Sequence, residues 1–158
     1  LNSGFNLRPT EIQAAIAHNQ FKRLDNLKKI KRKNHLKIVK SFLKNKKWKN
    51  QFTFILENKN VSANWFGLSI LINKHLVYKK EKFINYLTKI GIENRPIISG
   101  NFINQPSFNL FKFKANKKTL LGSQEIENRG FFIGLDNKEV DGKTIKFLTN
   151  NLLKISEI

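Results

Sequence analysis

A long run of apolar residues with helical spacing occupies the first third of the chain. Between Thr10 and about Lys44, apolar side chains recur mostly at spacings of three and four residues, with a gap around Gln20 and with lysine and arginine on the other face. At about 1.5 Å per residue, one continuous helix over this range would be about 50 Å long. We therefore expect part of this helix to rest on something outside the chain, or the helix to bend or break near Asn34-His35.

Shorter apolar runs in the rest of the chain predict a small sheet and further helices. We expect strands at residues 52–56, 65–72, 92–99 and 131–135, and helices at residues 79–90, 123–127 and 140–155. The second strand alternates imperfectly, as a central strand covered on both faces would, and Pro96 places the third at an edge or a bulge. This order predicts one α+β domain, with a long N-terminal helix and a small, mostly antiparallel sheet that has helices on one face.

The helix start at Thr10 has polar groups packed just ahead of it. Thr10 and Gln13 have the spacing of a capping box, in which each side chain accepts from the backbone amide of the other residue. Pro9 favours an extended conformation at Arg8. Asn6 and Arg8 therefore project beside the positive end of a helix, which suits an anion such as a phosphate. The alternative is a capped helix whose Asn6 and Arg8 are merely solvated.

Composition adds a strong positive charge. The 158 residues include 30 lysine and arginine residues against 11 aspartate and glutamate residues, which gives a net charge of +19. Such a charge fits nucleic-acid or acidic-membrane binding. However, lysine far outnumbers arginine, the residue preferred for bidentate contacts, and the lysines are spread along the whole chain. We read Trp65, Phe66 and Leu68 as core residues rather than a base-stacking platform, because no basic residue interleaves with them. We expect no nucleic-acid or membrane partner.

The sequence gives no sign of a metal site or of export. It contains no cysteine, and His18, His35 and His75 are scattered without a second ligand at suitable spacing, so we expect no bound metal. No apolar run reaches 18 residues, and the N-terminus lacks the pattern of a signal peptide. The expected location is the cytoplasm.

Four short motifs are spread along the chain, at residues 4–15 (GFNLRPTEIQAA), 64–67 (NWFG), 91–96 (GIENRP) and 129–134 (RGFFIG). Together they resemble the DegT/DnrJ/EryC1/StrS family of vitamin B6-dependent enzymes, which act on nucleotide-linked sugars. The resemblance implies a fold-type I transferase, a pyridoxal or pyridoxamine 5′-phosphate cofactor and a homodimer. It covers nearly the whole chain but only the C-terminal third or so of a family enzyme. Residues 1–158 are therefore expected to be the C-terminal small domain, with residues 1–45 joining it to an upstream cofactor-binding domain.

The loop that begins at Gly100 resembles one branch of this family. Its sugar aminotransferases usually read His-x-Gln-Pro here, with histidine where this chain has Ile103. Gly100-Asn101-Phe102 followed by Gln105-Pro106 instead resembles the 3-dehydrases, and is closest to those of CDP-4-keto-6-deoxyglucose. These enzymes remove the C3 hydroxyl of a nucleotide-linked 4-keto-6-deoxyhexose through a pyridoxamine phosphate adduct, in deoxysugar and lipopolysaccharide O-antigen biosynthesis. Asn104 stands where they often carry arginine, which leaves the sugar and the nucleotide open.

The resemblance also assigns roles to individual residues. Asn6 would hydrogen-bond the cofactor phosphate in the neighbouring subunit's active site, with Arg8 close by. Arg95 would face the nucleotide-sugar substrate, and Asn101 and Gln105 would line the sugar pocket. The residues alone also allow Arg95 to form a surface ion pair.

The catalytic residue is expected to lie upstream of this chain. It would be a histidine in a dehydrase and a lysine in an aminotransferase, so the chain on its own is expected to contain no catalytic residue and to be inactive. A nucleotide-sugar aminotransferase is the alternative among enzymes. A basic nucleic-acid-binding module is the alternative from another class.

Overall fold

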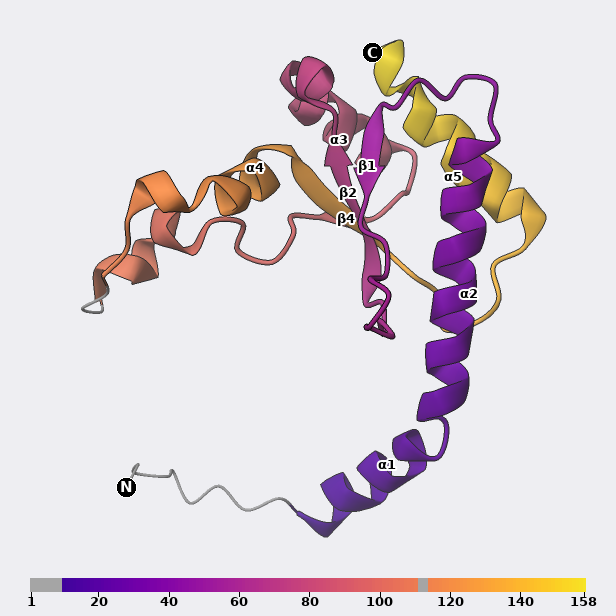
Figure 1. The fold of residues 1–158 in the computed structure, drawn as a ribbon. Coiled ribbons are helices and arrows are strands. Elements are labelled where there is room, and N and C mark those ends of the chain that lie inside the picture. Colours follow the sequence, from indigo (N-terminus) through magenta and orange to yellow (C-terminus); the bar gives the residue numbers. More distant parts are fainter. Residues whose placement is uncertain (1–9, 111–113) are drawn as a thin grey trace.

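The computed structural model describes residues 10–110 and 114–158 (Figure 1). Along this part of the chain the main elements are α1 (Glu11–Phe21), α2 (Leu24–Leu43), β1 (Phe52–Phe54), β2 (Gly67–Ile72), α3 (Lys80–Lys89), β3 (Asn94–Arg95), α4 (Leu121–Arg129), β4 (Gly130–Gly134) and α5 (Gly142–Leu153). A helix or strand therefore forms in each region where the apolar pattern predicts one, and the α+β class is confirmed.

The four strands form one antiparallel sheet in the order β1-β2-β4-β3. The longer strands β2 and β4 lie at its centre and pair from Gly67 opposite Gly134 to Leu71 opposite Gly130. The short strand β3 pairs with β4 through two residues and lies at the edge, next to Pro96, as the sequence predicts.

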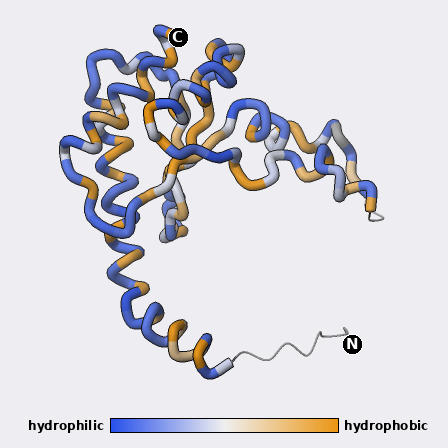
Figure 2. The backbone as a smooth tube through the Cα atoms, turned by 180° about the vertical axis from the view of Figure 1, so that it is seen from behind, coloured by the Kyte–Doolittle hydropathy of each residue, from blue (hydrophilic) through white to orange (hydrophobic). Residues whose placement is uncertain are grey.

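One face of the sheet carries the core. Leu68, Ile70 and Ile72 of β2 alternate with less buried residues, and Phe131 and Ile133 of β4 do the same. Against this face pack buried residues of the helices α2, α3 and α5, among them Phe42, Phe83 and Leu152. Hydrophobic colour in Figure 2 accordingly gathers along the strands and recurs along these helices. Full burial of such a side chain stabilises the fold by about 1.5–3 kcal/mol.

The predicted long helix is broken, but not at the predicted place. Helix α1 ends at Phe21 and α2 begins at Leu24, so the chain turns at Lys22-Arg23 and α1 projects away from the sheet (Figure 1). The expectation of a bend near Asn34-His35 is wrong. Both of these side chains are fully buried within α2, and their contacts hold the helix against the rest of the domain. None of the α1 residues is buried, so no packing forces α1 to continue the axis of α2.

Phe66 is the main error among the predicted core residues. Leu68 is buried and Trp65 is half-buried, but Phe66 is 77% exposed. Pairing between β2 and β4 begins only at Gly67. Phe66 therefore lies outside the paired strand, and its side chain is not held in the alternation that buries Leu68 and Ile70. No helix in the described part of the chain is long and apolar enough to cross a membrane.

Candidate functional site

The N-terminal part of the predicted site is described only from Thr10 onward. The capping box forms as predicted: the Thr10 amide donates to Gln13 Oε1 at 2.9 Å, and the Gln13 amide donates to Thr10 Oγ1 at 3.3 Å. Asn6 and Arg8 lie outside the described residues. Their role beside the positive end of α1 remains a prediction.

Arg95 lies on the face of the sheet opposite the core. It pairs with Phe132 of β4, which pairs in turn with Ser69 of β2, so these three residues share that face. The guanidinium donates to Glu93 Oε1 from Nε at 3.0 Å and from Nη2 at 2.7 Å. The side chains of both partners are more than half exposed, so this ion pair is worth at most about 1 kcal/mol. Arg95 can therefore exchange Glu93 for another anion with little loss of free energy.

A shallow hollow of about 260 Å³ surrounds Arg95 on this face. We call it the Arg95 hollow; it is lined by Lys31, Phe66, Glu93, Arg95, Phe132, Gly134, Leu135 and Asn137. The rings of Phe66 and Phe132 lie with their centroids 5.7 Å apart at an angle of 60°. The ammonium of Lys31, from α2, lies 5.8 Å from the centroid of the Phe66 ring. Two aromatic rings and two cations thus border one small concavity.

Gly67 makes this arrangement possible. A Cβ atom at Gly67 would come within 2.6 Å of Phe132 Cδ2 and 2.7 Å of the Ile133 carbonyl oxygen. The Phe132 ring therefore lies over the glycine backbone, in space that any side chain at this position would fill. The motif at residues 64–67 thus supplies both the exposed Phe66 and the room for Phe132.

The loop that begins at Gly100 is fixed to α4 by side-chain amides. Asn101 is only 2% exposed, and its Nδ2 donates to Gln124 Oε1 at 3.1 Å. Its backbone amide donates to Glu127 Oε2 at 3.2 Å. Asn104 Nδ2 donates to the same two acceptors, at 2.9 Å and 2.7 Å. These contacts order the loop, and they engage one N–H of the side-chain amide that Asn101 would offer to a sugar.

Gln105 lines a different hollow from Arg95. This second hollow, of about 360 Å³, is bordered by Lys80, by residues 96–100 and by Glu127. Gln105 Nε2 donates to the Ser99 carbonyl at 2.8 Å, and Lys80 Nζ donates to the Glu127 carbonyl at 2.9 Å. Partial burial lowers the pKa of Lys80, and the nearby Glu127 carboxylate partly offsets this.

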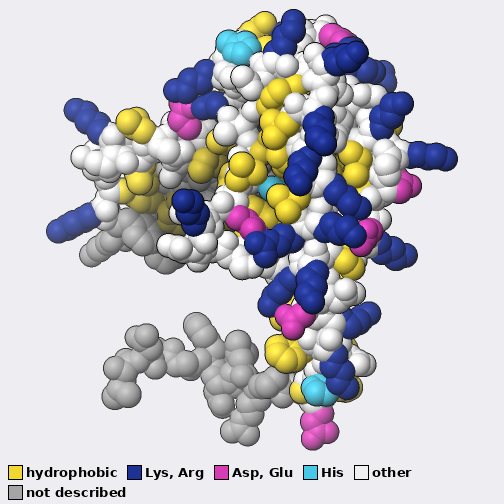
Figure 3. Space-filling model, turned by 45° about the vertical axis from the view of Figure 1, so that its right-hand side comes forward, with side chains coloured by type: hydrophobic (Ala, Val, Ile, Leu, Met, Phe, Trp, Pro, Cys, Tyr) yellow, Lys and Arg dark blue, Asp and Glu magenta, His cyan; other side chains and the backbone are white. Residues whose placement is uncertain are grey.

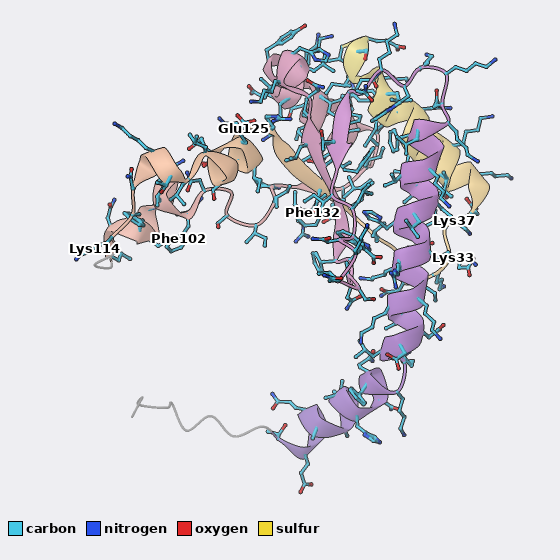
Figure 4. The ribbon with its side chains drawn as sticks, viewed as in Figure 1. Lys33, Lys37, Phe102, Lys114, Glu125 and Phe132 are labelled. Atoms are coloured by element: carbon cyan, nitrogen blue, oxygen red, sulfur yellow. The ribbon has the colours of Figure 1, made fainter. Side chains whose placement is uncertain are left out.

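The structure therefore does not bring the predicted substrate residues into a single pocket. Figure 4 agrees with this separation, since Phe132 lies at the sheet while Phe102 lies out on the segment that projects from it. The roles of Arg95, Asn101 and Gln105 in substrate binding remain predictions.

The side chain of Arg129 is held by contacts within the domain. Its Nε donates to the Ile72 carbonyl at 2.7 Å, and its Nη1 is paired with Glu125 one turn earlier in α4. The hydrogen bond from Arg129 lowers the pKa of Glu125. The residue thus ties the end of α4 to strand β2.

Within the described residues, no group of three histidine, cysteine or acidic side chains is placed to hold a metal ion. His35 is 1% exposed, and its ring stacks on Trp65 with centroids 4.1 Å apart. Neither ring nitrogen makes a hydrogen bond of normal geometry. Burial lowers the pKa of His35 and favours the neutral ring, and the nearby Ile55 backbone and Glu57 carboxylate offset this in part.

Sequence reasoning did not find three of the residues that border the Arg95 hollow, namely Lys31, Phe66 and Phe132. Lys31 belongs to a lysine-rich helix in which its charge does not stand out, Phe66 was read as a core residue, and Phe132 was placed only within a predicted strand. A weak signal was available in the glycine that follows Phe66, because glycine inside a strand often marks a place where another group lies close to the backbone.

The model of the DegT/DnrJ/EryC1/StrS aminotransferase family matches residues 1–145. The chain belongs to this family. Its sequence is similar to two GDP-4-keto-6-deoxy-D-mannose 3-dehydratases. That of Escherichia coli O55:H7 is 29% identical over 132 residues, which is 83% of this chain and 32% of the enzyme. That of Yersinia pseudotuberculosis is 27% identical over 153 residues, which is 96% of this chain and 37% of the enzyme.

A solved structure agrees with these sequence matches. The E. coli GDP-4-keto-6-deoxy-D-mannose-3-dehydratase with bound hydrated PLP superposes with a TM-score of 0.79 at 27% identity, over 96% of this chain and 37% of that one. The chain therefore spans about a third of the length of the relatives it matches. Its fold is that of a part of a family enzyme.

Proposed function

We propose that the chain is the C-terminal small domain of an enzyme that removes the C3 hydroxyl of a nucleotide-linked 4-keto-6-deoxyhexose. The observation that carries this proposal is the similarity to 3-dehydratases along 83–96% of the chain. The loop with Gly100, Asn101, Gln105 and Pro106 supports the same branch of the family, and Gly100 adopts a left-handed conformation with a φ of 62°. On this proposal, residues 1–45 join the domain to an upstream cofactor-binding domain.

The residues of the chain fit the phosphate end of a pyridoxal or pyridoxamine 5′-phosphate cofactor. The capped N-terminus of α1 presents backbone amides and the positive end of a helix, directly after Asn6 and Arg8 in the sequence. When bound, the cofactor supplies the electron-withdrawing ring that the chemistry at the sugar requires. Asn6 would hydrogen-bond the phosphate across a subunit boundary, so the enzyme is proposed to be a homodimer.

The substrate end is assigned to Arg95, Asn101 and Gln105. Arg95 presents a planar fork of donors, which suits a diphosphate or a keto-sugar oxygen. The relatives described above are named for GDP-linked sugars, whereas the loop most resembles that of enzymes for a CDP-linked sugar. The proposal therefore fixes the class, a nucleotide-linked 4-keto-6-deoxyhexose used in deoxysugar and lipopolysaccharide synthesis, and not the nucleotide.

The residue at the cofactor-linking position of the upstream sequence is the first test. Histidine supports the dehydrase, and lysine turns the assignment to a nucleotide-sugar aminotransferase.

In the second test, the protein together with this upstream domain is incubated with GDP-4-keto-6-deoxymannose, the cofactor and an amine donor. Mass spectrometry should show a product that has lost the C3 oxygen. A product with an amine at C4 supports the aminotransferase, and no product with any nucleotide sugar contradicts both. The 158-residue chain alone should give no product.

A further inference from the structure

Glu127 of α4 differs from many other acidic residues of the chain in what it binds. Acidic residues number 11 against 30 lysine and arginine residues, and they lie scattered among cations on the face shown in Figure 3. Glu57, Glu93 and Glu139, for example, each pair with a lysine or an arginine. No lysine or arginine nitrogen of the described residues lies within ion-pair distance of the Glu127 carboxylate, which instead accepts hydrogen bonds from two uncharged groups.

Both of these groups belong to residues 100–105, which we call the Gly100 loop. Glu127 Oε2 accepts from the Asn101 amide at 3.2 Å and from Asn104 Nδ2 at 2.7 Å. A hydrogen bond to a carboxylate is roughly twice as strong as one between neutral groups. Gln124, three residues earlier and so on the same face of α4, accepts from Nδ2 of the same two loop residues. One face of α4 thus holds the loop through four hydrogen bonds.

The backbone of Glu127 is held as well. Its carbonyl accepts from Nζ of Lys80, the first residue of α3, at 2.9 Å. Gly100 packs directly against its side chain, since a Cβ atom at Gly100 would lie 2.8 Å from Glu127 Cβ and 2.9 Å from its Cγ. Helix α4 and the Gly100 loop accordingly run side by side and project together from the sheet (Figure 1). Glu127 therefore lies where α3, α4 and the loop meet.

These contacts decide which loop residues can reach a ligand. Asn101 is only 2% exposed, and one N–H of its side chain is already engaged, so it lies inside this junction. Gln105 instead borders the hollow of about 360 Å³ that Lys80 and Glu127 also line. Its Nε2 donates to a backbone carbonyl at 2.8 Å, and its Oε1 accepts no hydrogen bond from the described residues. Of the two amides expected at the sugar, Gln105 is the one that is open to a ligand.

We propose that Glu127 is a positioning residue of the enzyme: it holds the Gly100 loop so that Gln105 lies at the hollow and contacts the sugar. This inference rests on the proposed function, since it names the residue that orients a sugar contact. It also reassigns Asn101, whose amide groups support the loop instead of touching the substrate. Without the carboxylate, the Asn101 amide and one N–H of Asn104 lose their acceptor, and the loop is no longer fixed to α4.

The effect on the loop can be measured by amide hydrogen exchange on the 158-residue chain. Glu127→Ala removes the acceptor of the Asn101 amide, so exchange of this amide should become about ten-fold faster or more. Glu127→Gln keeps an oxygen acceptor on a side chain of the same length and should restore most of the protection. Circular dichroism verifies that each variant is folded.

Glu125 provides a matched control on the same helix. It is also a glutamate of α4, but it lies at the end next to the sheet (Figure 4), pairs with Arg129 and makes no hydrogen bond to the Gly100 loop. Glu125→Ala should lower the melting temperature, because it removes this ion pair. It should leave exchange of the Asn101 amide within about two-fold of the wild-type rate.

The effect on the substrate is measured as separate kcat and KM values for GDP-4-keto-6-deoxymannose, with the chain joined to its upstream domain. Loss of one hydrogen bond to the bound sugar corresponds to about a 3- to 10-fold loss of affinity. Glu127→Ala and Gln105→Ala should therefore each raise KM by about 3- to 10-fold and change kcat by less than about two-fold. Glu127→Gln should return KM to within about two-fold of the wild-type value, and Glu125→Ala should leave it unchanged.

The double variant decides whether Glu127 acts through Gln105. Glu127→Ala combined with Gln105→Ala should raise KM no further than Gln105→Ala alone, because no sugar contact is left to misplace. Effects on KM that multiply in the double variant would overturn the proposal. An Asn101 amide that exchanges equally slowly in Glu127→Ala and in the wild-type chain would overturn it as well.

Failure of this inference and failure of the proposed function are distinguishable. If the wild-type enzyme removes no hydroxyl from the nucleotide sugar, the proposed function fails and the role of Gln105 fails with it. The exchange experiment then still shows whether Glu127 orders the loop. If the Glu127→Ala enzyme dehydrates the sugar with a wild-type KM, the proposed function stands and the inference fails.

Discussion

Single buried amides connect α2 to the rest of the domain. Asn34 is fully buried, and its Nδ2 donates to the carbonyls of Asp136 and Lys138, at 3.2 Å and 2.8 Å. Its Oδ1 accepts from the Val140 amide at 3.0 Å. Asn34→Ala leaves these groups unpaired, so we expect a loss of about 2–4 kcal/mol in the free energy of unfolding, measured with urea. The control Asn26→Ala, at an exposed position of α2, should cost less than about 0.5 kcal/mol. Equal losses would show that the buried contacts contribute nothing.

His35 should make stability depend on pH. Burial lowers its pKa in the folded protein, whereas the unfolded chain titrates near pH 6.5, so the unfolded state binds the proton more tightly. The stability contributed by neutral His35 is therefore fully present above about pH 6.5 and is lost as the pH falls below it. The slope for one such group is at most about 1.4 kcal/mol per pH unit. Urea unfolding between pH 5.5 and 7.5, followed by tryptophan fluorescence, should show this decrease.

The variant His35→Phe separates this effect from other titrations. Phenylalanine keeps a flat ring to stack on Trp65 and takes up no proton. The lowered pKa values of Glu125, Glu139 and Asp141 act at more acidic pH, because their ordinary values lie near 4. Between pH 5.5 and 7.5 the slope should therefore disappear in His35→Phe. If His35→Phe keeps the full slope, a group other than His35 causes the pH dependence of stability.

Among the elements, the turn from Ile97 to Gly100 should tolerate no side chain at its last residue. Gly100 has a φ of 62°, and a Cβ atom there would lie 2.8 Å from Glu127 Cβ. Gly91, which follows α3, has a φ of 81° but open space around it. Gly91→Ala should therefore cost only the backbone strain, about 1–2 kcal/mol. Gly100→Ala should cost clearly more in urea unfolding and should shift the NMR signals of Asn101 and Gln124. Equal costs would show that α4 moves away freely.

The apolar pattern predicted the elements themselves well, because most of their apolar residues face one common core. The strand pairing at the edge also followed from Pro96, and the helix start followed from Thr10 and Gln13. The break at Lys22-Arg23 lies close to the gap in the pattern around Gln20, but no glycine or proline marks it. Its position depends on where packing ends, and a pattern of spacings does not contain that information.

The candidate site was less predictable than the fold. Arg95 was found through its motif, and the structure adds that it lies on the open face of the sheet beside Phe132. Phe66 was misread because an exposed phenylalanine and a buried one look alike in sequence. Only the register that starts β2 at Gly67 separates them. For Asn101 the motif suggests a contact with the sugar, but in the structure its side-chain amide is hydrogen-bonded to Gln124 of α4. The sequence did not reveal this contact.

For the whole molecule, repulsion among cations should outweigh the ion pairs. The chain carries 30 lysine and arginine residues against 11 acidic ones, and most of its ion pairs are substantially exposed and so contribute little. Raising NaCl from about 0.1 M to 1 M shortens the screening length from about 10 Å to 3 Å. This removes repulsion between lysines that are well separated, and it affects ion pairs in contact less. We therefore expect the melting temperature to rise by a few degrees, measured by circular dichroism.

Two lysines of α2 provide the matched test of this expectation. Lys37 pairs with Glu139 at 3.3 Å, whereas Lys40 is exposed, has no ion pair with the described residues and has lysines three residues before and four residues after it. Like charges at these spacings on a helix destabilise it by a few tenths of a kcal/mol. Lys40→Gln should therefore raise the melting temperature at 0.1 M NaCl and reduce its increase with salt. Lys37→Gln should raise it less, because it also removes a contact with Glu139, which Lys33 still holds. If the wild-type protein instead melts at a lower temperature in 1 M NaCl, its ion pairs contribute more than the repulsion costs, and the two variants should then both be destabilising.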